Sequence, residues 1–374
     1  MTELSKVSGI DWILFLALLP ILAAGLVTMS SFTGQSVYFD RQLIWIGLSL
    51  VIFFSLSFVD FRFLRRTEVV VSLYLLTLIM LVGLSVFGHI TNGAQSWFNF
   101  GAFSIQPSDP AKLVLVILLA KYFSRRHVEI RHVRHILVSG IYAFIFFFLI
   151  LIEPDFGSSI IIFLIWLGMV LLSGISKKHF FIVFGIGAVA FAGLWFYALK
   201  PYQKARIVDF IHPLTNIAGS GYNAYQSTIA FGSGGLLGKG LGFGTQSRLN
   251  FLPEHQTDFI FAAFAEEWGF VGVVTLLILF VVVIWRIILN AMHGVSNFEI
   301  LFGAGLAIYF MAHIIINFGM NMGILPVTGL VAPFMSYGGS HLLTEFAGLG
   351  ILMGMRRYRR TAHKDVMQNE FLGI

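Results

Sequence analysis

Long apolar stretches separated by short polar segments make up most of this chain, and they limit the folds it can adopt. A helix needs about 20 apolar residues to cross the roughly 30 Å hydrocarbon core of a membrane. On that criterion the sequence predicts about ten membrane-spanning helices. The predicted spans are Ile10–Met29, Gln42–Val59, Val69–Gly88, Pro110–Phe123, Ile136–Ile152, Ser158–Leu172, Phe180–Leu199, Phe259–Trp285, Ile300–Phe318 and Leu342–Met355.

The composition points to the same class of protein. Of 374 residues, 57% are hydrophobic and 11% are charged, whereas soluble domains average about 45–50% and about 25%. This excludes a soluble enzyme, and the low charge excludes a disordered chain. The absence of cysteine excludes disulfides and thiolate metal sites. We predict an all-α polytopic membrane protein, with residues 1–360 as a single transmembrane domain and residues 361–374 as a short cytoplasmic tail.

The basic residues predict the orientation of the chain, because cytoplasmic segments are enriched in Lys and Arg. With the N-terminus in the cytoplasm, 17 of the 24 Lys and Arg residues fall on the cytoplasmic side. Both termini are then predicted to be cytoplasmic, and the basic clusters are expected to anchor the chain to anionic lipid.

One outer segment, residues 200–257, is much longer than the others. It has 58 residues, is rich in Gly, Ser, Asn and Gln, and contains no spanning helix. Loops of this length in compact proteins are usually functional or disordered, and we predict an ordered extracytoplasmic loop with short helices. We expect it to fold over the outer mouth of the bundle, because its apolar side chains need burial. These side chains include Leu236, Leu237, Phe243 and Phe251.

Ionisable groups at membrane depth are costly and are therefore candidate functional residues. Asp109 and Lys112 are three residues apart, so they share one helix face and can neutralise each other. A structural ion pair and a direct catalytic role both fit this pair. Further ionisable residues predicted on the outer half are Glu153, Asp155, Asp258, Glu266, Glu267, His313 and Glu345.

The depth of Asp258 follows from the helix that precedes Arg286. Counting back from Arg286, about 20 residues of spanning helix end near Glu266. Asp258 then lies roughly 12 Å further out, at the depth of the lipid headgroups, if the helix continues to it. Thr257 is well placed to cap this helix. The alternative role for Asp258 is that of a first-turn carboxylate complementing the helix dipole.

Three other features allow more than one interpretation. Trp97 in GAQSWF is either an anchor at the membrane interface or a ring that stacks on a sugar. The glycine-rich run around Lys239 is weak evidence for nucleotide binding because no strand precedes it, but its amides and Lys239 can hold an anion. The segment Leu325–Ser340 predicts a broken or re-entrant element that is buried or lines a cavity, and it is either a substrate contact or a turn that packs helices together.

Taken in order, six motifs resemble the SEDS family (shape, elongation, division, sporulation) across about Asp11–Arg360. They are GAQSWF, QPSDPAK, EPDFGSS, GSGGLLGKGLGFGTQSRLNFLPEHQTDFIFAAFAEEWGF, NFGMNMGILPVTGLVAPFMSYGGS and a basic tail. RLNFLPE and EEWGF resemble the rod-shape elongation branch more than the division branch. The chain departs from the family pattern at Asp109, where Glu is usual, and at Gln256, where His is common.

The resemblance implies a peptidoglycan glycosyltransferase of the bacterial inner membrane with an extracytoplasmic active site. It further implies that the protein polymerises lipid II during elongation and works with a class B penicillin-binding protein. It places the family's essential aspartate at Asp258, and functionally sensitive positions at Trp97, Asp109, Lys112 and Asp155. The expected partners are lipid II, that penicillin-binding protein and membrane lipid, with no nucleic acid.

The implied reaction converts an α-linked sugar diphosphate into a β-1,4 glycan and so inverts the anomeric centre. It needs a base for the acceptor hydroxyl and a positive group for the leaving diphosphate. We predict Asp258 as the base, with Lys112, Lys239, Arg206 or a divalent Mg or Mn ion offsetting the leaving-group charge. A cation-ligand role for Asp258 competes with this, and no nucleotide or organic cofactor is expected. Further predicted substrate contacts are Glu254, Thr257, Ser336 and Ser340.

Two other classes of function remain open. Intramembrane acids and a lysine also describe a transporter, such as a lipid II flippase. A non-catalytic membrane scaffold of the wall-synthesis complex is the other alternative. A flippase moves lipid II unchanged, whereas a polymerase makes glycan strands. In a scaffold, Asp258→Ala would leave function intact.

Overall fold

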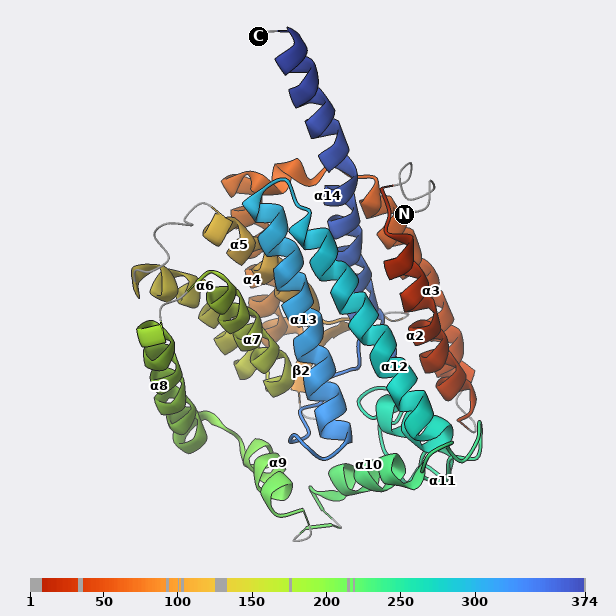
Figure 1. The fold of residues 1–374 in the computed structure, drawn as a ribbon. Coiled ribbons are helices and arrows are strands. Elements are labelled where there is room, and N and C mark those ends of the chain that lie inside the picture. Colours follow the sequence, from red (N-terminus) through yellow and green to blue (C-terminus); the bar gives the residue numbers. More distant parts are fainter. Residues whose placement is uncertain are drawn as a thin grey trace.

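The chain folds into a bundle of long helices with short helices across one end (Figure 1). The computed structural model describes residues 9–32, 36–91, 94–99, 101, 104–124, 133–174, 177–213, 216–217 and 219–372. Within these residues the bundle helices are α2 (Trp12–Ser30), α3 (Ser36–Ser57), α4 (Thr67–Phe87), α5 (Ser108–Ser124), α6 (Val133–Ile152), α7 (Phe156–Leu172), α8 (Lys177–Gly193), α12 (Ile260–Met292), α13 (Asn297–Asn321) and α14 (Gly339–Leu372).

Each predicted span falls on one of these bundle helices, and the π-helix η2 (Leu194–Ala198) completes the span that begins with α8. Among the described residues, six helices are long and apolar enough to cross a membrane, and α7 is a shorter apolar helix. The predicted all-α polytopic membrane fold is confirmed.

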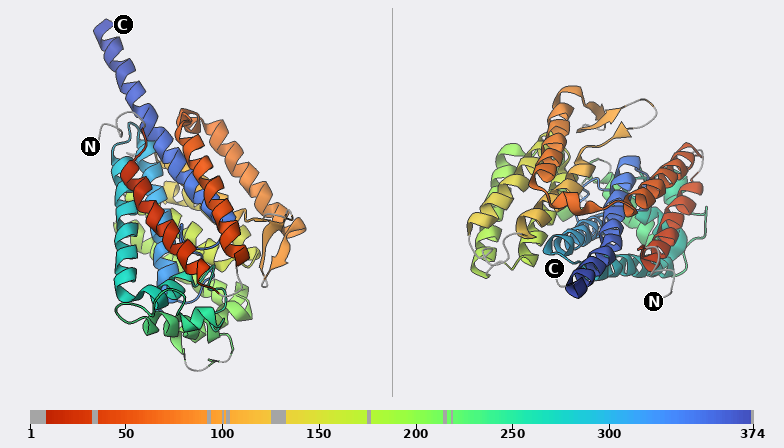
Figure 2. Two further views of the ribbon diagram at one scale, coloured as in Figure 1. Left: turned by 90° about the vertical axis from the view of Figure 1, so that its right-hand side faces the viewer. Right: turned by 90° about the horizontal axis from the view of Figure 1, so that it is seen from above.

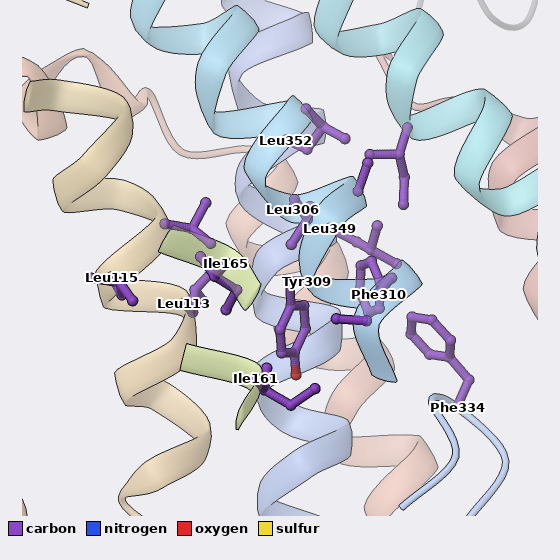
Figure 3. Packing of buried hydrophobic residues seen from close by; sticks show 14 of the residues in the cluster. Leu113, Leu115, Ile161, Ile165, Leu306, Tyr309, Phe310, Phe334, Leu349 and Leu352 are labelled. Carbon is purple, nitrogen blue, oxygen red and sulfur yellow. The ribbon is translucent and has the colours of Figure 1, made fainter. Parts of the chain in front are cut away.

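Helices α5 and α13 form the centre of the bundle. Almost every residue of α5 is buried, and α13 packs against α5, α7, α12 and α14. Figure 3 shows apolar side chains from α5, α7, α13 and α14 meeting in this core, with Tyr309 and Phe310 of α13 among them. A helix that is apolar on all sides is expected to be buried in this way.

One end of the bundle is held together by the buried carboxylate of Asp11. This residue caps α2 and accepts hydrogen bonds from Arg286 Nη2 at 2.6 Å and Asn290 Nδ2 at 2.8 Å. Arg356 of α14 lies 3.3 Å from the same carboxylate. Because these residues come from α2, α12 and α14, a single carboxylate joins three helices at the end where α2 begins and α14 extends beyond the bundle (Figure 1).

The described part of the segment 200–257 lies across the opposite end, as predicted, and contains the short helices α9 (Pro201–Ile211), α10 (Tyr222–Ser233) and α11 (Thr245–Arg248). The 3-10 helix η1 (Phe61–Arg65) precedes α4. A small antiparallel sheet, which was not predicted, has the strand order β1 (His89–Thr91), β2 (Ala94–Asn99) and β3 (Ser104–Ile105). Figure 2 shows it at the edge of the bundle beside α4.

Helix α12 is interrupted at Gly269, where φ is 64° and ψ is −167°. The glycine-rich segment after α10 pairs with the exposed backbone groups on both sides of this break. Lys239 N donates to Glu266 O at 3.0 Å, and Phe270 N donates to Gly235 O at 2.9 Å. Non-helical backbone at membrane depth is tolerated when its polar groups are satisfied within the protein. The predicted depth of Asp258 assumed an unbroken helix between Arg286 and Asp258. Because α12 is interrupted at Gly269, that prediction is not supported.

Two further local predictions are wrong. Thr257 does not cap α12, because the helix begins only at Ile260 and the Thr257 hydroxyl donates instead to Glu254 Oε2 at 3.0 Å. The apolar loop side chains are not buried either. The segment of Leu236 and Leu237 pairs with α12 through its backbone, with Val271 N donating to Leu236 O at 3.1 Å, and leaves these two side chains outward. The exposed fractions are 73% for Leu236, 81% for Leu237, 67% for Phe243 and 47% for Phe251.

The break in α12 predicts a strong requirement for glycine at position 269. A Cβ atom there would lie 2.2 Å from Gly238 N and 2.7 Å from Leu237 C, at a positive φ. Gly269→Ala should therefore lower the free energy of unfolding by about 2–4 kcal/mol, measured by thermal or denaturant unfolding in detergent. The control is Gly47→Ala in α3, where a Cβ meets nothing within 4 Å. Equal stability of the two variants would contradict this account.

Candidate functional site

Asp155 is held in a fixed orientation at the start of α7. One carboxylate oxygen accepts from Ser158 N at 3.0 Å and so caps the helix. The other accepts from Gln106 Nε2 at 2.8 Å and lies 3.4 Å from Ser108 Oγ. Asp155 thus joins the start of α7 to the start of α5.

Asp258 is held through its backbone. Its carbonyl oxygen accepts from Asn317 Nδ2 and Asn321 Nδ2, each at 3.0 Å. The preceding carbonyl, of Thr257, accepts from Ser336 Oγ at 2.6 Å. Contacts from α13 and from the segment before α14 thus fix the backbone at Asp258 without use of its carboxylate.

The Asp258 carboxylate and the Arg206 guanidinium converge on Gly329. A Cβ atom on Gly329 would lie 3.6 Å from Asp258 Oδ2 and 3.8 Å from Arg206 Nη1. Arg206 comes from α9, where its guanidinium lies 5.8 Å from the centre of the Tyr202 ring. The segment 200–257 therefore brings a cation to the predicted catalytic carboxylate.

The pKa of Asp258 is raised to about 7, mainly because the group is buried. The negative charge of Glu254 raises this pKa further, and that of Asp155 does so to a smaller extent, whereas the positive charge of Arg206 lowers it. A carboxyl group with a pKa near neutrality is suited to accept a proton at physiological pH. Four predicted site residues, Asp155, Arg206, Glu254 and Asp258, thus act on one another electrostatically.

Glu153 lies two residues before Asp155 and is buried, with no hydrogen-bond partner for either carboxylate oxygen among the described residues. Burial raises its pKa to about 8, and the charge of Asp155 adds to this rise. Glu153 is therefore mainly neutral at pH 7.

The predicted pair of Asp109 and Lys112 forms, with Lys112 Nζ 3.1 Å from Asp109 Oδ1 and both side chains buried. Ser340 Oγ accepts from Gln106 N at 3.2 Å, and its neighbour His341 lies 3.3 Å from Asp109. These contacts place Asp109, Lys112 and Ser340 together near the start of α5. Gln106 connects this group to Asp155.

Lys239 belongs to a different set of contacts. Its Nζ lies 2.7 Å from Glu266 Oε1 and 3.0 Å from Thr245 Oγ1. Backbone amides of the glycine run donate to α12, including Gly240 N to Glu267 O at 3.1 Å. These amides are already paired, so they do not form the predicted anion cradle.

The remaining predicted contacts occupy separate places. Trp97 is part of β2 and is partly exposed. Thr257 pairs with Glu254, which has a positive φ of 51°. The predicted re-entrant segment, Leu325–Ser340, is non-helical up to α14, and Leu330, Phe334 and Met335 within it are buried.

The sequence did not predict the residues that hold the site together. These are Gln106, Asn317, Asn321 and His341, the last of which contacts Asp109. Asn317 and Asn321 did carry a signal, since two amides four residues apart in an apolar helix lie on one face. Within the described ranges, no three His, Asp or Glu side chains come close enough together to hold a metal ion.

Comparison with known proteins gives consistent matches over nearly the whole chain. The FtsW/RodA/SpoVE family, described as cell cycle proteins, matches residues 7–361. Peptidoglycan glycosyltransferase MrdB of Escherichia coli (strain K12) is 35% identical over 358 residues, which is 96% of this chain and 96% of that protein.

Two solved structures resemble this fold. Rod shape determining protein RodA of Thermus thermophilus gives a TM-score of 0.71 at 30% identity, covering 93% of this chain and 97% of that chain. A chain from a structure described as "Structural coordination of polymerization and crosslinking by a peptidoglycan synthase complex" gives a TM-score of 0.80 at 30% identity, covering 93% and 98%.

The raised pKa of Asp258 predicts a pH-dependent contribution to stability. Between about pH 4, the pKa of an unperturbed Asp, and about pH 7, the folded state binds more protons at this site than the unfolded state does. The contribution of Asp258 to stability should therefore fall as pH rises through this window. Asp258→Asn lacks it, so its unfolding temperature should rise relative to the wild type from pH 4 to pH 7 and then level off. A constant difference across this range would refute the assignment.

Proposed function

This chain belongs to the FtsW/RodA/SpoVE (SEDS) family, and we propose that it is a peptidoglycan glycosyltransferase that polymerises lipid II into glycan strands. The observation that carries the proposal is that the Asp258 carboxyl group, with its pKa raised to about 7, and the Arg206 guanidinium both lie close to Gly329. A base and a cation at one point are what an inverting transfer from a sugar diphosphate requires.

In the proposed reaction, the ionised Asp258 accepts the proton of the acceptor sugar hydroxyl. The hydroxyl oxygen attacks the anomeric carbon of the donor and forms the new glycosidic bond. The bond from that carbon to the diphosphate oxygen breaks, and the diphosphate leaves with both bonding electrons. Arg206 is the cation best placed to stabilise this charge, because Lys112 and Lys239 are already paired with Asp109 and Glu266.

The other predicted residues are proposed as substrate contacts or supports. Asp155 and Glu254 shape the charge around Asp258, and Trp97 offers a ring for a sugar face. Proposed contacts retained from the sequence are Asp109, Lys112, Lys239, Thr257, Ser336 and Ser340.

A divalent cation is the competing partner for Asp258. Mg²⁺ is commonly held by one or two carboxylates together with substrate phosphates. Since no three-ligand cluster exists among the described side chains, such an ion would arrive with the diphosphate and share Asp258 with it. Loss of activity with a chelator, restored by Mg²⁺ or Mn²⁺, would favour this role.

We place the protein in the bacterial inner membrane with both termini cytoplasmic and the site extracytoplasmic. We further propose a role in cell elongation beside a class B penicillin-binding protein. The support is the similarity to a rod shape determining protein and to a chain of a synthase complex that coordinates polymerisation with crosslinking.

Purified wild-type protein, supplied with lipid II and the cognate penicillin-binding protein, should make glycan strands detectable by gel electrophoresis. Folded Asp258→Asn should lose at least about 100-fold in rate, the size of effect expected when a general base is removed. Strands from the folded variant at the wild-type rate would exclude a catalytic Asp258. No strands from an intact wild-type complex, together with lipid II movement across vesicles, would favour a flippase.

The rate of strand formation should rise with pH through about 7, because the base must be ionised. Glu254→Gln removes a charge that raises the pKa of Asp258, so the midpoint of the pH–rate profile should move to lower pH. The control is Glu68→Gln, an exposed acid in the first turn of α4. A midpoint unchanged by Glu254→Gln would contradict the proposed environment of the base.

A further inference from the structure

The first turns of α14 carry three buried polar residues, Ser340, His341 and Glu345, that contact other elements. Neither the predicted contacts nor the proposed reaction gives His341 a role. Its two ring nitrogens face two different carboxylates, Asp109 Oδ1 at 3.3 Å and Glu345 Oε1 at 2.9 Å.

The first of these contacts leads to Asp155. Asp109 lies in the first turn of α5, directly after the residues that contact α14 and α7. Ser340 Oγ accepts from Gln106 N at 3.2 Å and donates to Gln106 O at 3.3 Å. Gln106 Nε2 then donates to Asp155 Oδ2 at 2.8 Å. Contacts from α14 therefore fix the start of α5, which in turn holds Asp155.

The second contact leads to Asp258. Glu345 Oε2 accepts from Phe334 N at 2.9 Å. Phe334 has a φ of 58°, a conformation that is unfavourable for a bulky side chain and needs support from its surroundings. Two residues later, Ser336 Oγ donates to the carbonyl of Thr257 at 2.6 Å. Contacts from α14 therefore also fix the segment that holds the residue before Asp258.

With Asp109 and Glu345 both ionised, a protonated His341 balances the charges of this cluster. Asp109 is paired with Lys112, and among the described residues the ion-pair partner of Glu345 is His341. A protonated imidazole carries a donor on each nitrogen, so His341 can hydrogen-bond to Asp109 and form an ion-pair contact with Glu345. The other titratable groups packed against it are Tyr309 and His313 of α13, with the His313 ring centre 4.8 Å and the Tyr309 ring centre 6.4 Å from that of His341.

We propose that His341 is a positioning residue. It bridges Asp109 and Glu345 and thereby fixes the positions of Asp155 and Asp258 relative to each other. The consequence for catalysis rests on the proposed glycosyltransferase function. The bridge itself is a structural claim, and it can be tested without the reaction.

The test compares His341→Ala, Glu345→Gln and the double variant. His341→Ala leaves Glu345 as an unpaired buried charge, which is destabilising. Adding Glu345→Gln removes that charge and keeps an oxygen for the Phe334 amide. The matched control is His135→Ala in α6, which removes another buried histidine, hydrogen-bonded to Tyr122 at 3.0 Å. His135 lies near the start of α6, whereas Asp155 follows the end of that helix.

Three quantities are measured on the full chain in nanodiscs: the unfolding temperature, the rate of strand formation at saturating lipid II, and amide hydrogen exchange. His341→Ala should lower the unfolding temperature and the rate, the latter by up to about 100-fold if the site groups shift by 1 Å. Exchange should increase in residues 104–112 and in residues 330–338 together. The double variant should recover the unfolding temperature but not the rate, and His135→Ala should change neither exchange region.

A rate that recovers together with the unfolding temperature in the double variant would overturn the proposal, because His341 would then matter only for stability. Unchanged exchange in either segment would also overturn it. If the wild type makes no strands, the exchange data alone decide the bridge. Increased exchange in both segments would then support it while the proposed function fails.

Discussion

The charge balance inside an apolar bundle is the constraint on which the rest of this structure depends. An unpaired charge is costly at membrane depth, and three buried acids of the bundle are accordingly paired with bases. Asp11 pairs with Arg286, Asp109 with Lys112, and Glu266 with Lys239. Asp258 differs, because Glu254 and Asp155 add negative charge around it and its pKa rises. Its environment therefore favours proton uptake near neutral pH, which structural ion pairs do not provide.

Neutral polar side chains perform the second task, which is to fix irregular backbone. Asn317 and Asn321 bind the carbonyl of Asp258, and Ser336 binds the carbonyl before it. The same principle operates at Gly269, where backbone groups of the glycine-rich segment close the break in α12. Because these amides and hydroxyls hold the backbone, the Asp258 carboxylate is not needed for structural hydrogen bonds.

Sequence patterns predicted what depends on local spacing. Apolar length located every bundle helix, and the spacing of three residues predicted the ion pair of Asp109 with Lys112. Contacts between distant segments were not predictable. His341 lies 232 residues from Asp109, and the break in α12 depends on how a remote segment packs. Leu236 and Leu237 were predicted to be buried in the protein because they are hydrophobic. Hydrophobicity indicates that a side chain avoids water, but it does not distinguish burial in a protein core from contact with lipid or with a partner protein.

The most direct test of the central claim is a structure of this protein with lipid II bound beside a growing glycan strand. The account predicts the donor diphosphate against Arg206 and the acceptor hydroxyl within hydrogen-bond distance of the Asp258 carboxylate. Gly329 would lie beside both, since a Cβ there would be 3.6 Å from Asp258 Oδ2 and 3.8 Å from Arg206 Nη1. A diphosphate bound instead at Lys239 and Glu266, with Asp258 out of reach of either sugar, would contradict it.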